Sequence, residues 1–138
     1  MGDYQLIDHT ADFGLRVKGS DPADLFAKSG LAMFDVLTDI SVLKGSKVQT
    51  VRVDGDGWSD LMVNWLRELL YLWAGEEKLV SSIEIVSLSE TSLTAMVTYD
   101  NFLPEKHPIE SEIKAVTYHQ LQVSPVGDGW EAQIIFDV

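Results

Sequence analysis

Residues 59–76 constrain the fold more than any other segment, because they are apolar around most of a helical circumference. The apolar positions are Leu61, Met62, Trp65, Leu66, Leu69, Leu70, Leu72 and Trp73, and the polar positions are Asn64, Arg67, Glu68 and Tyr71. A helix with so narrow a polar side is buried on most sides. We therefore predict that this helix forms the centre of the core, with its tryptophans as core side chains and Gly75 as its C-terminal stop.

A second helix is predicted over residues 22–37. Its start is marked by Ser20-Asp21-Pro22, a capping side chain followed by a proline in the first turn, where the missing N–H costs nothing. Apolar residues then recur at a spacing of about 3.6. Gly30 interrupts this pattern, so it marks either a weak point in the helix or a place where another element packs closely.

The remaining periodic segments alternate as strands do and come in hairpin-like pairs. They cover residues 4–7, 14–18, 47–53, 82–88, 92–99, 113–121 and 130–138. Together with the two principal helices they predict an α+β fold with a mainly antiparallel sheet. A chain of 138 residues without a linker or an internal repeat predicts one domain over residues 1–138.

The net charge of −12 comes from 22 acidic and 10 basic residues, and the basic residues are scattered singly. Tight, direct nucleic-acid binding is therefore not expected, whereas a metal cation or a basic partner protein suits the sign. The absence of cysteine excludes disulfides and thiol nucleophiles. No apolar run approaches the roughly 20 residues that span a membrane, and no secretion signal is present, so we expect a cytoplasmic protein.

Asp8-His9-Thr10-Ala11-Asp12 concentrates oxygen donors in a predicted turn. Such a turn suits a hard cation. The alternative is an Asx-type turn, in which Asp8 or Asp12 bonds its own backbone.

Other local patterns carry less chemistry. Asp54-Gly55-Asp56-Gly57 resembles the start of a calcium loop, but Ser59 and Trp65 stand where that loop needs glycine and glutamate, so we expect it only to lead into the helix. The histidines His9, His107 and His119 have no zinc-site spacing, and each is expected to be a structural hydrogen-bonding residue.

Two features near the C-terminus are less usual. If the final strand runs to the end of the chain, Asp137 lies beside the terminal carboxylate of Val138, and the two repel each other unless a cation neutralises them. Lys114 interrupts an apolar run, so its side chain either extends to the surface or reaches a carboxylate or phosphate.

Three segments together resemble the signature of the archease family. They are the turn at residues 8–12, the run Glu112-Ile113-Lys114-Ala115-Val116-Thr117-Tyr118-His119, and the terminal Phe136-Asp137-Val138. They occur in the family's order, and the resemblance extends over nearly the whole chain. Phe13 departs from the family, because a smaller aliphatic residue is commoner there, and so does the segment at residues 101–107, which could alter the fit to a partner.

The resemblance implies a strand–helix–strand–strand core with an inserted subdomain. It implies an accessory protein, not an enzyme, that activates an RtcB-type RNA ligase in tRNA splicing or RNA repair by promoting ligase guanylylation and multiple turnover. It also implies a divalent metal ion, calcium in the first place with magnesium or manganese as alternatives, held by Asp12, Asp137 and Val138. Lys114 corresponds to the family's essential lysine. Asp8, His9 and His119 are motif positions without an assigned role.

Two other functions remain open from the sequence. One is a chaperone-like modulator of a tRNA methyltransferase, an earlier proposal for the family. The other is a metal-dependent hydrolase in which Asp12 and Asp137 bind the metal and His9 or His119 acts as the base.

Overall fold

A computed structural model describes residues 4–8 and 12–138, and for Asp8 and Asp12 it describes the backbone only. In chain order the elements are β1 (Tyr4–Asp8), β2 (Asp12–Gly19), α1 (Pro22–Leu37), the 3₁₀ turn η1 (Ile40–Val42), β3 (Lys47–Asp54), α2 (Trp58–Ala74), β4 (Lys78–Leu88), β5 (Ser92–Asn101), β6 (Ala115–Val126) and β7 (Gly129–Asp137).

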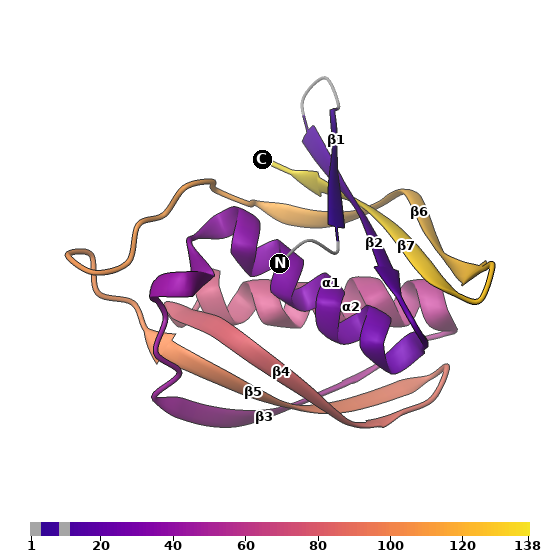
Figure 1. Ribbon diagram of the computed structural model, residues 1–138, viewed down its shortest axis with the longest axis horizontal. Helices are drawn as coiled ribbons and strands as arrows, with labels where there is room; N and C mark the ends of the chain where they lie inside the picture. The colour runs from indigo at the N-terminus through magenta and orange to yellow at the C-terminus, as the bar shows by residue number, and fades with distance from the viewer. Residues whose placement is uncertain (1–3, 9–11) are drawn as a thin grey trace.

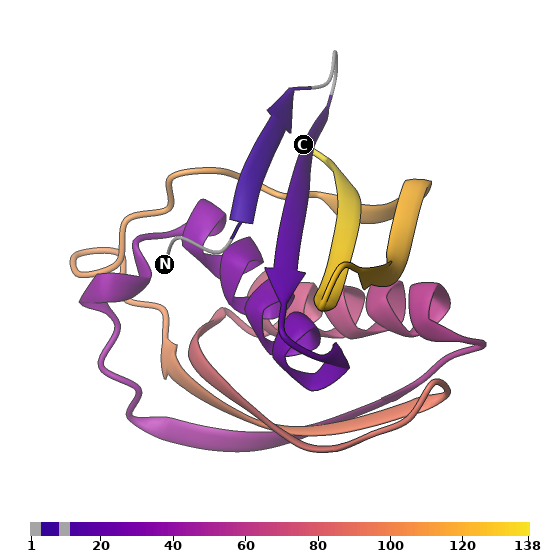
Figure 2. The same cartoon turned by 45° about the vertical axis from the view of Figure 1, so that its right-hand side comes forward.

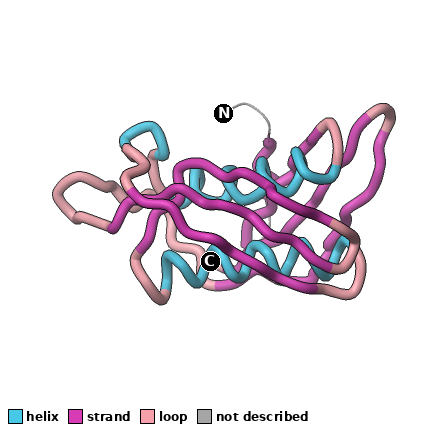
Figure 3. Tube along the Cα trace, turned by 90° about the horizontal axis from the view of Figure 1, so that it is seen from below, coloured by secondary structure: helices cyan, strands magenta, loops and turns pink. Residues whose placement is uncertain are grey.

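The strands form two antiparallel sheets, and the two helices lie between them (Figures 1 and 2). One sheet has the order β1-β2-β7-β6, and the other has the order β3-β5-β4. Viewed from below, the three strands of the second sheet run across the helices (Figure 3). The prediction of an α+β fold with two principal helices and mainly antiparallel pairing is confirmed.

The chain order also contains the insertion that the family resemblance implies. The strand–helix–strand–strand unit is β2-α1-β6-β7, in which α1 packs on the sheet that contains the three strands. Between α1 and β6 the chain adds β3-α2-β4-β5, which builds the whole second sheet and the central helix. The inserted part therefore supplies the second outer layer, and it covers the face of the helices that the first sheet leaves open.

Helix α1 has the bounds that the sequence predicts, and its start is encoded locally. The Asp21 side chain accepts a hydrogen bond from the Asp24 N–H at 2.8 Å, and Pro22 occupies the first turn. Gly30 marks a close approach: a Cβ there would lie 2.7 Å from the Cδ1 atoms of both Ile83 and Leu69. The glycine thus lets α1 pack directly against β4 and α2.

Helix α2 is the buried centre of the molecule, as predicted. Trp65 is fully buried, and its indole N–H donates to the carbonyl oxygen of Phe26 at 2.9 Å, which satisfies the one polar atom of the side chain. The helix ends at Ala74 rather than Glu76, with Gly75 as its C-cap. Gly75 keeps a helical backbone, and the turn that follows uses a positive φ of 54° at Glu77.

Strand β6 differs from the prediction at both ends. It begins at Ala115 and continues through Pro125 to Val126. Proline is tolerated because β6 is an edge strand, where one side of the backbone needs no partner. The pairing with β7 is interrupted between Thr117 and Gln122, where Gln120 has a φ of 51°.

In the described part of the chain, no helix has the length and hydrophobicity needed to cross a membrane.

Candidate functional site

Described residues of the three signature segments meet at one end of the first sheet. In the β2–β7 ladder the backbone of Asp12 lies opposite Asp137, and in the β6–β7 ladder Ala115 lies opposite the same residue. The N–H of Lys114 donates to the carbonyl oxygen of Asp137 at 2.8 Å. Segments more than 100 residues apart in the chain are therefore neighbours, with Asp137 in the middle strand.

Aromatic packing one position before Asp137 holds this register. The rings of Phe13 and Phe136 stack with centroids 5.2 Å apart, and Phe136 is fully buried. Val116 lies opposite Phe136 on the other side and is also buried. A slip of one residue would turn these side chains away from the core. Phe136 is buried in this register, whereas Asp137, the next residue, is exposed.

Lys114 has a fixed backbone position and an exposed side chain. Ile113 before it is buried, and the hydrogen bond to Asp137 fixes the peptide. The side chain is exposed and forms no ion pair or hydrogen bond with the residues that the structure describes. The lysine side chain extends to the surface, and its contact with a carboxylate or phosphate of another molecule stays a prediction.

A hollow of about 270 Å³ lies between Lys114 and helix α2. Arg67, Tyr71 and Ala74 line it from the helix, and Lys114 and Ala115 line it from the other side. Tyr71 is largely exposed. The free ammonium group therefore borders a depression that a partner's side chain could enter.

Arg67 is a residue that the sequence did not single out. Its Nε and Nη2 atoms donate to the carbonyl oxygen of Val116 at 3.2 and 3.1 Å. The guanidinium also lies 4.9 Å from the centre of the Tyr118 ring. Arg67 thus connects α2 to the first residues of β6, which follow Lys114. Its place on the polar side of the helix was the only sign of this role.

The Tyr118 hydroxyl completes this connection by donating to Asp60 at 2.6 Å. This hydrogen bond, together with partial desolvation and the carboxylate charge, raises the pKa of Tyr118. The same bond is the main cause that holds the pKa of Asp60 below its ordinary value. The β6 side of the site is therefore attached to α2 at two points, through Arg67 and through Asp60.

The other predicted positions are only partly placed. His9 lies outside the described residues, and Asp8 is described only as the end of β1, opposite Phe13. His119 is exposed within the interrupted part of β6, and its N–H donates to the Thr117 hydroxyl at 3.2 Å. His107 lies elsewhere, and its ring accepts a hydrogen bond from the Leu103 N–H, so its expected structural role is confirmed.

The metal prediction rests on side chains that are only partly described. Among the described residues no three acidic or histidine side chains cluster as metal ligands, but the carboxylate of Asp12 is not among them. Asp137 and Val138 are both exposed.

The segment at residues 54–57 leads into α2, as predicted. Gly57 is the N-cap with a φ of 100°, and the Asp56 N–H donates to Asp60.

Residues 4–138 match the archease protein family (MTH1598/TM1083). The chain is 34% identical to the protein archease of Methanosarcina acetivorans, with 98% of this chain and 95% of that protein covered. It is 32% identical to the protein archease of Pyrococcus abyssi, with both chains fully covered. The solution structure of protein 1598 of Methanobacterium thermoautotrophicum superposes with a TM-score of 0.82 at 26% identity, over the full length of both chains.

Proposed function

We propose, from the premise that this chain belongs to the archease family, that it is an accessory protein that activates an RtcB-type RNA ligase. On this proposal the protein is not itself an enzyme, and it promotes guanylylation and multiple turnover of the ligase in tRNA splicing or RNA repair. The observation that carries the proposal is the register that brings Asp12, Asp137 and Lys114 together at one end of the first sheet.

On this proposal, a hard divalent cation binds at this end of the sheet. The proposed donors are the carboxylates of Asp12 and Asp137 and a main-chain oxygen of Val138. An all-oxygen set favours calcium, magnesium or manganese over zinc or copper. Such an ion, when bound, would neutralise the neighbouring carboxylates and leave coordination positions for oxygen groups of the ligase complex. We propose calcium in the first place.

Lys114 is the proposed point of contact with the partner. Its fixed peptide and unengaged ammonium group suit recognition of a phosphate or a carboxylate. Asp8, His9 and His119 would support the geometry of the site. The net charge of −12 would favour docking on a basic surface, as expected near an RNA-binding channel.

The decisive experiment measures guanylylation and ligation by the cognate ligase, with and without this protein. The ligase is present in smaller amounts than its RNA substrate, so that each ligase molecule must turn over several times. We expect stimulation by the wild type and a loss of at least tenfold for Lys114→Ala, Asp137→Ala and Asp12→Ala. Lys47→Ala removes an exposed lysine of β3 and serves as the matched control. Full stimulation by the three site variants would refute the residue assignment.

The same preparations separate the alternative functions. Substrate turnover by the purified protein alone, abolished by a chelator, would indicate a metal-dependent hydrolase. Affinity purification that recovers a tRNA methyltransferase and no ligase would indicate the chaperone-like modulator. Wild-type protein that leaves guanylylation unchanged would reject the proposed activation.

A further inference from the structure

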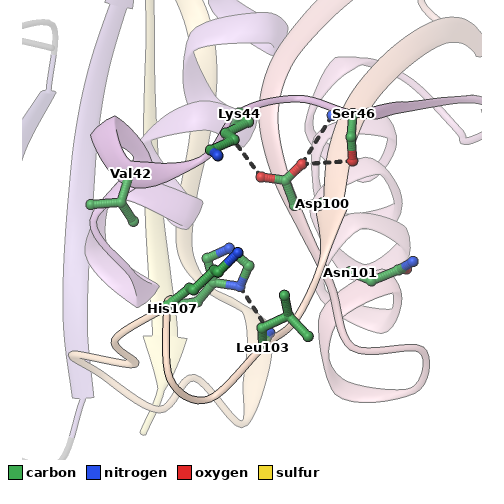
Figure 4. Close-up of a pocket in the computed structure, with 8 residues that line it drawn as sticks. Val42, Lys44, Ser46, Asp100, Asn101, Leu103 and His107 are labelled. Atoms are coloured by element: carbon green, nitrogen blue, oxygen red, sulfur yellow. Dashed lines mark hydrogen bonds between the residues drawn. The ribbon is translucent and has the colours of Figure 1, made fainter.

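A pocket of about 340 Å³ lies apart from the signature segments, where the connection between η1 and β3 meets the end of β5 and the turn that follows it (Figure 4). Val42 is the last residue of η1, and Lys44 and Ser46 come from the segment between η1 and β3. Asp100 and Asn101 come from the end of β5, and Leu103, Lys106 and His107 come from the following turn. Its volume lies in the range of about 300–1,000 Å³ that is usual for small-molecule sites.

The one carboxylate in the wall is already engaged. Asp100 is 7% exposed, and its two oxygens accept hydrogen bonds from the Lys44 N–H at 2.7 Å and from the Ser46 N–H at 2.9 Å. The Ser46 hydroxyl donates a third bond at 3.0 Å. Burial acts to raise the pKa of Asp100, but these bonds outweigh it and hold the pKa below its ordinary value. Asp100 therefore stabilises the pocket wall, and its oxygens are already occupied by hydrogen bonds and poorly suited to bind a cation.

His107 presents a donor to the pocket. The imidazole is 7% exposed, and its Nδ1 accepts a hydrogen bond from the Leu103 N–H at 2.9 Å. Because Nδ1 is an acceptor, the ring hydrogen is on Nε2. Nε2 has no partner among the described residues, and Figure 4 shows the second ring nitrogen directed toward the space below Asp100.

The groups left unengaged around the pocket are mostly donors. Lys44 and Lys106 are exposed at its rim and form no ion pair with described residues, and His107 adds an N–H from the interior. Two lysines against one carboxylate give the pocket a positive balance, in a chain whose net charge is −12. Val42 and Leu103 supply apolar wall.

We propose that this pocket binds a small organic oxyanion, a carboxylate or a phosphate monoester with an apolar body. The charged group contacts Lys44, Lys106 and the Nε2–H of His107, and the apolar body rests on Val42 and Leu103. The site is independent of the proposed ligase activation, because it shares no residue with the Asp12–Asp137–Lys114 end of the first sheet.

Titration calorimetry and two-dimensional NMR with phenyl phosphate, benzoate, inorganic phosphate and benzylamine test this proposal on the full chain. We expect saturable binding of phenyl phosphate or benzoate, with amide shifts confined to residues 42–46 and 100–107. The better of these two probes identifies the oxyanion. Inorganic phosphate, which has no apolar body, should bind at least fivefold more weakly than phenyl phosphate.

Lys44→Ala and Lys106→Ala should each weaken binding about tenfold, since each removes a charge-assisted contact. Lys47→Ala, an exposed lysine outside the pocket, should leave the affinity unchanged. Thermal melting shows whether each variant is folded, and both pocket lysines are exposed, so folding should persist. Preference for benzylamine, failure of all anionic probes to saturate, or unchanged affinity in a folded Lys44→Ala/Lys106→Ala double variant would overturn the proposal.

Discussion

The backbone N–H of Lys114 donates to the carbonyl oxygen of Asp137 at 2.8 Å, so the proposed contact residue and the proposed metal ligand are held together by main-chain atoms. This bond does not depend on either side chain. Substitutions that keep the peptide N–H and C=O therefore test the chemistry of the lysine and the carboxylate separately from their placement.

Lys114→Ala should leave the free energy of unfolding within about 0.5 kcal/mol of the wild type, because the side chain is exposed and forms no hydrogen bond or ion pair with the described residues. Urea denaturation at pH 7 checks this value. A loss well above 1 kcal/mol would mean that the lysine is structural, and its effect on the ligase would then need another explanation.

Asp137→Asn should weaken divalent metal binding at least tenfold, because the variant removes a charged oxygen ligand. Calorimetry with calcium, magnesium and manganese measures this affinity. Deletion of Val138 should weaken binding too. Asp128→Asn, in the β6–β7 turn, removes a carboxylate of the same kind far along the sheet and is the control. If none of the three ions binds the wild type, the proposed metal site is wrong.

Arg67→Ala should loosen the strand that follows Lys114, since it removes both hydrogen bonds to the Val116 carbonyl oxygen. We expect a stability loss of about 1–2 kcal/mol and faster hydrogen exchange at the Lys114 amide. Exchange measured by NMR gives the local effect. Glu68→Ala changes the next exposed residue of α2 and should leave the exchange rate of the Lys114 amide unchanged. Equal effects of both variants would argue against a specific connection through Arg67.

Asp100→Ala should destabilise the protein by about 3 kcal/mol at pH 7, because it leaves two N–H groups and the Ser46 hydroxyl without their acceptor. The pKa of Asp100 is lowered in the folded state, so its contribution is complete above the ordinary value of 3.8 and is lost as the pH falls through the folded-state pKa. The difference from wild type should therefore shrink below pH 4.

Denaturant titrations at pH 7 and pH 3 measure this change, with Glu90→Ala, at the exposed β4–β5 turn, as the control. A difference that stays constant between the two pH values would show that the carboxylate charge has no part in the effect.

Ser29 and Gly30 are neighbours in α1 for which alanine should have opposite effects. The Ser29 hydroxyl is buried and has no hydrogen-bond partner among the described residues, so Ser29→Ala should stabilise the protein by about 1 kcal/mol. Gly30→Ala should destabilise it by about 1–3 kcal/mol, because the new Cβ meets Ile83 and Leu69.

Thermal melting of the two variants tests this pair directly. Gly30→Ala with unchanged or raised stability would show that helix propensity, which favours alanine over glycine by about 1 kcal/mol, outweighs the packing at this position.

The sequence alone determined the two helices and the fold class. Asp21 and Pro22 mark the start of α1 through contacts within one turn, and the apolar positions of α2 require burial on most sides. The signature segments at residues 8–12, 112–119 and 136–138 can also be recognised from the residues, and their order along the chain is enough to indicate the family. All of these signals are local in the chain.

Only the tertiary structure decided which distant atoms meet. The register that sets Asp12 opposite Asp137 depends on burying Phe136, and the bonds from Arg67 to the Val116 carbonyl oxygen join residues on different layers. The pocket beside His107 joins residues 42–46 to the end of β5 and the turn that follows it. Hydrophobic periodicity specifies the buried face of each element but not the neighbour that packs on it, because that choice is made by side-chain shape across the assembled core.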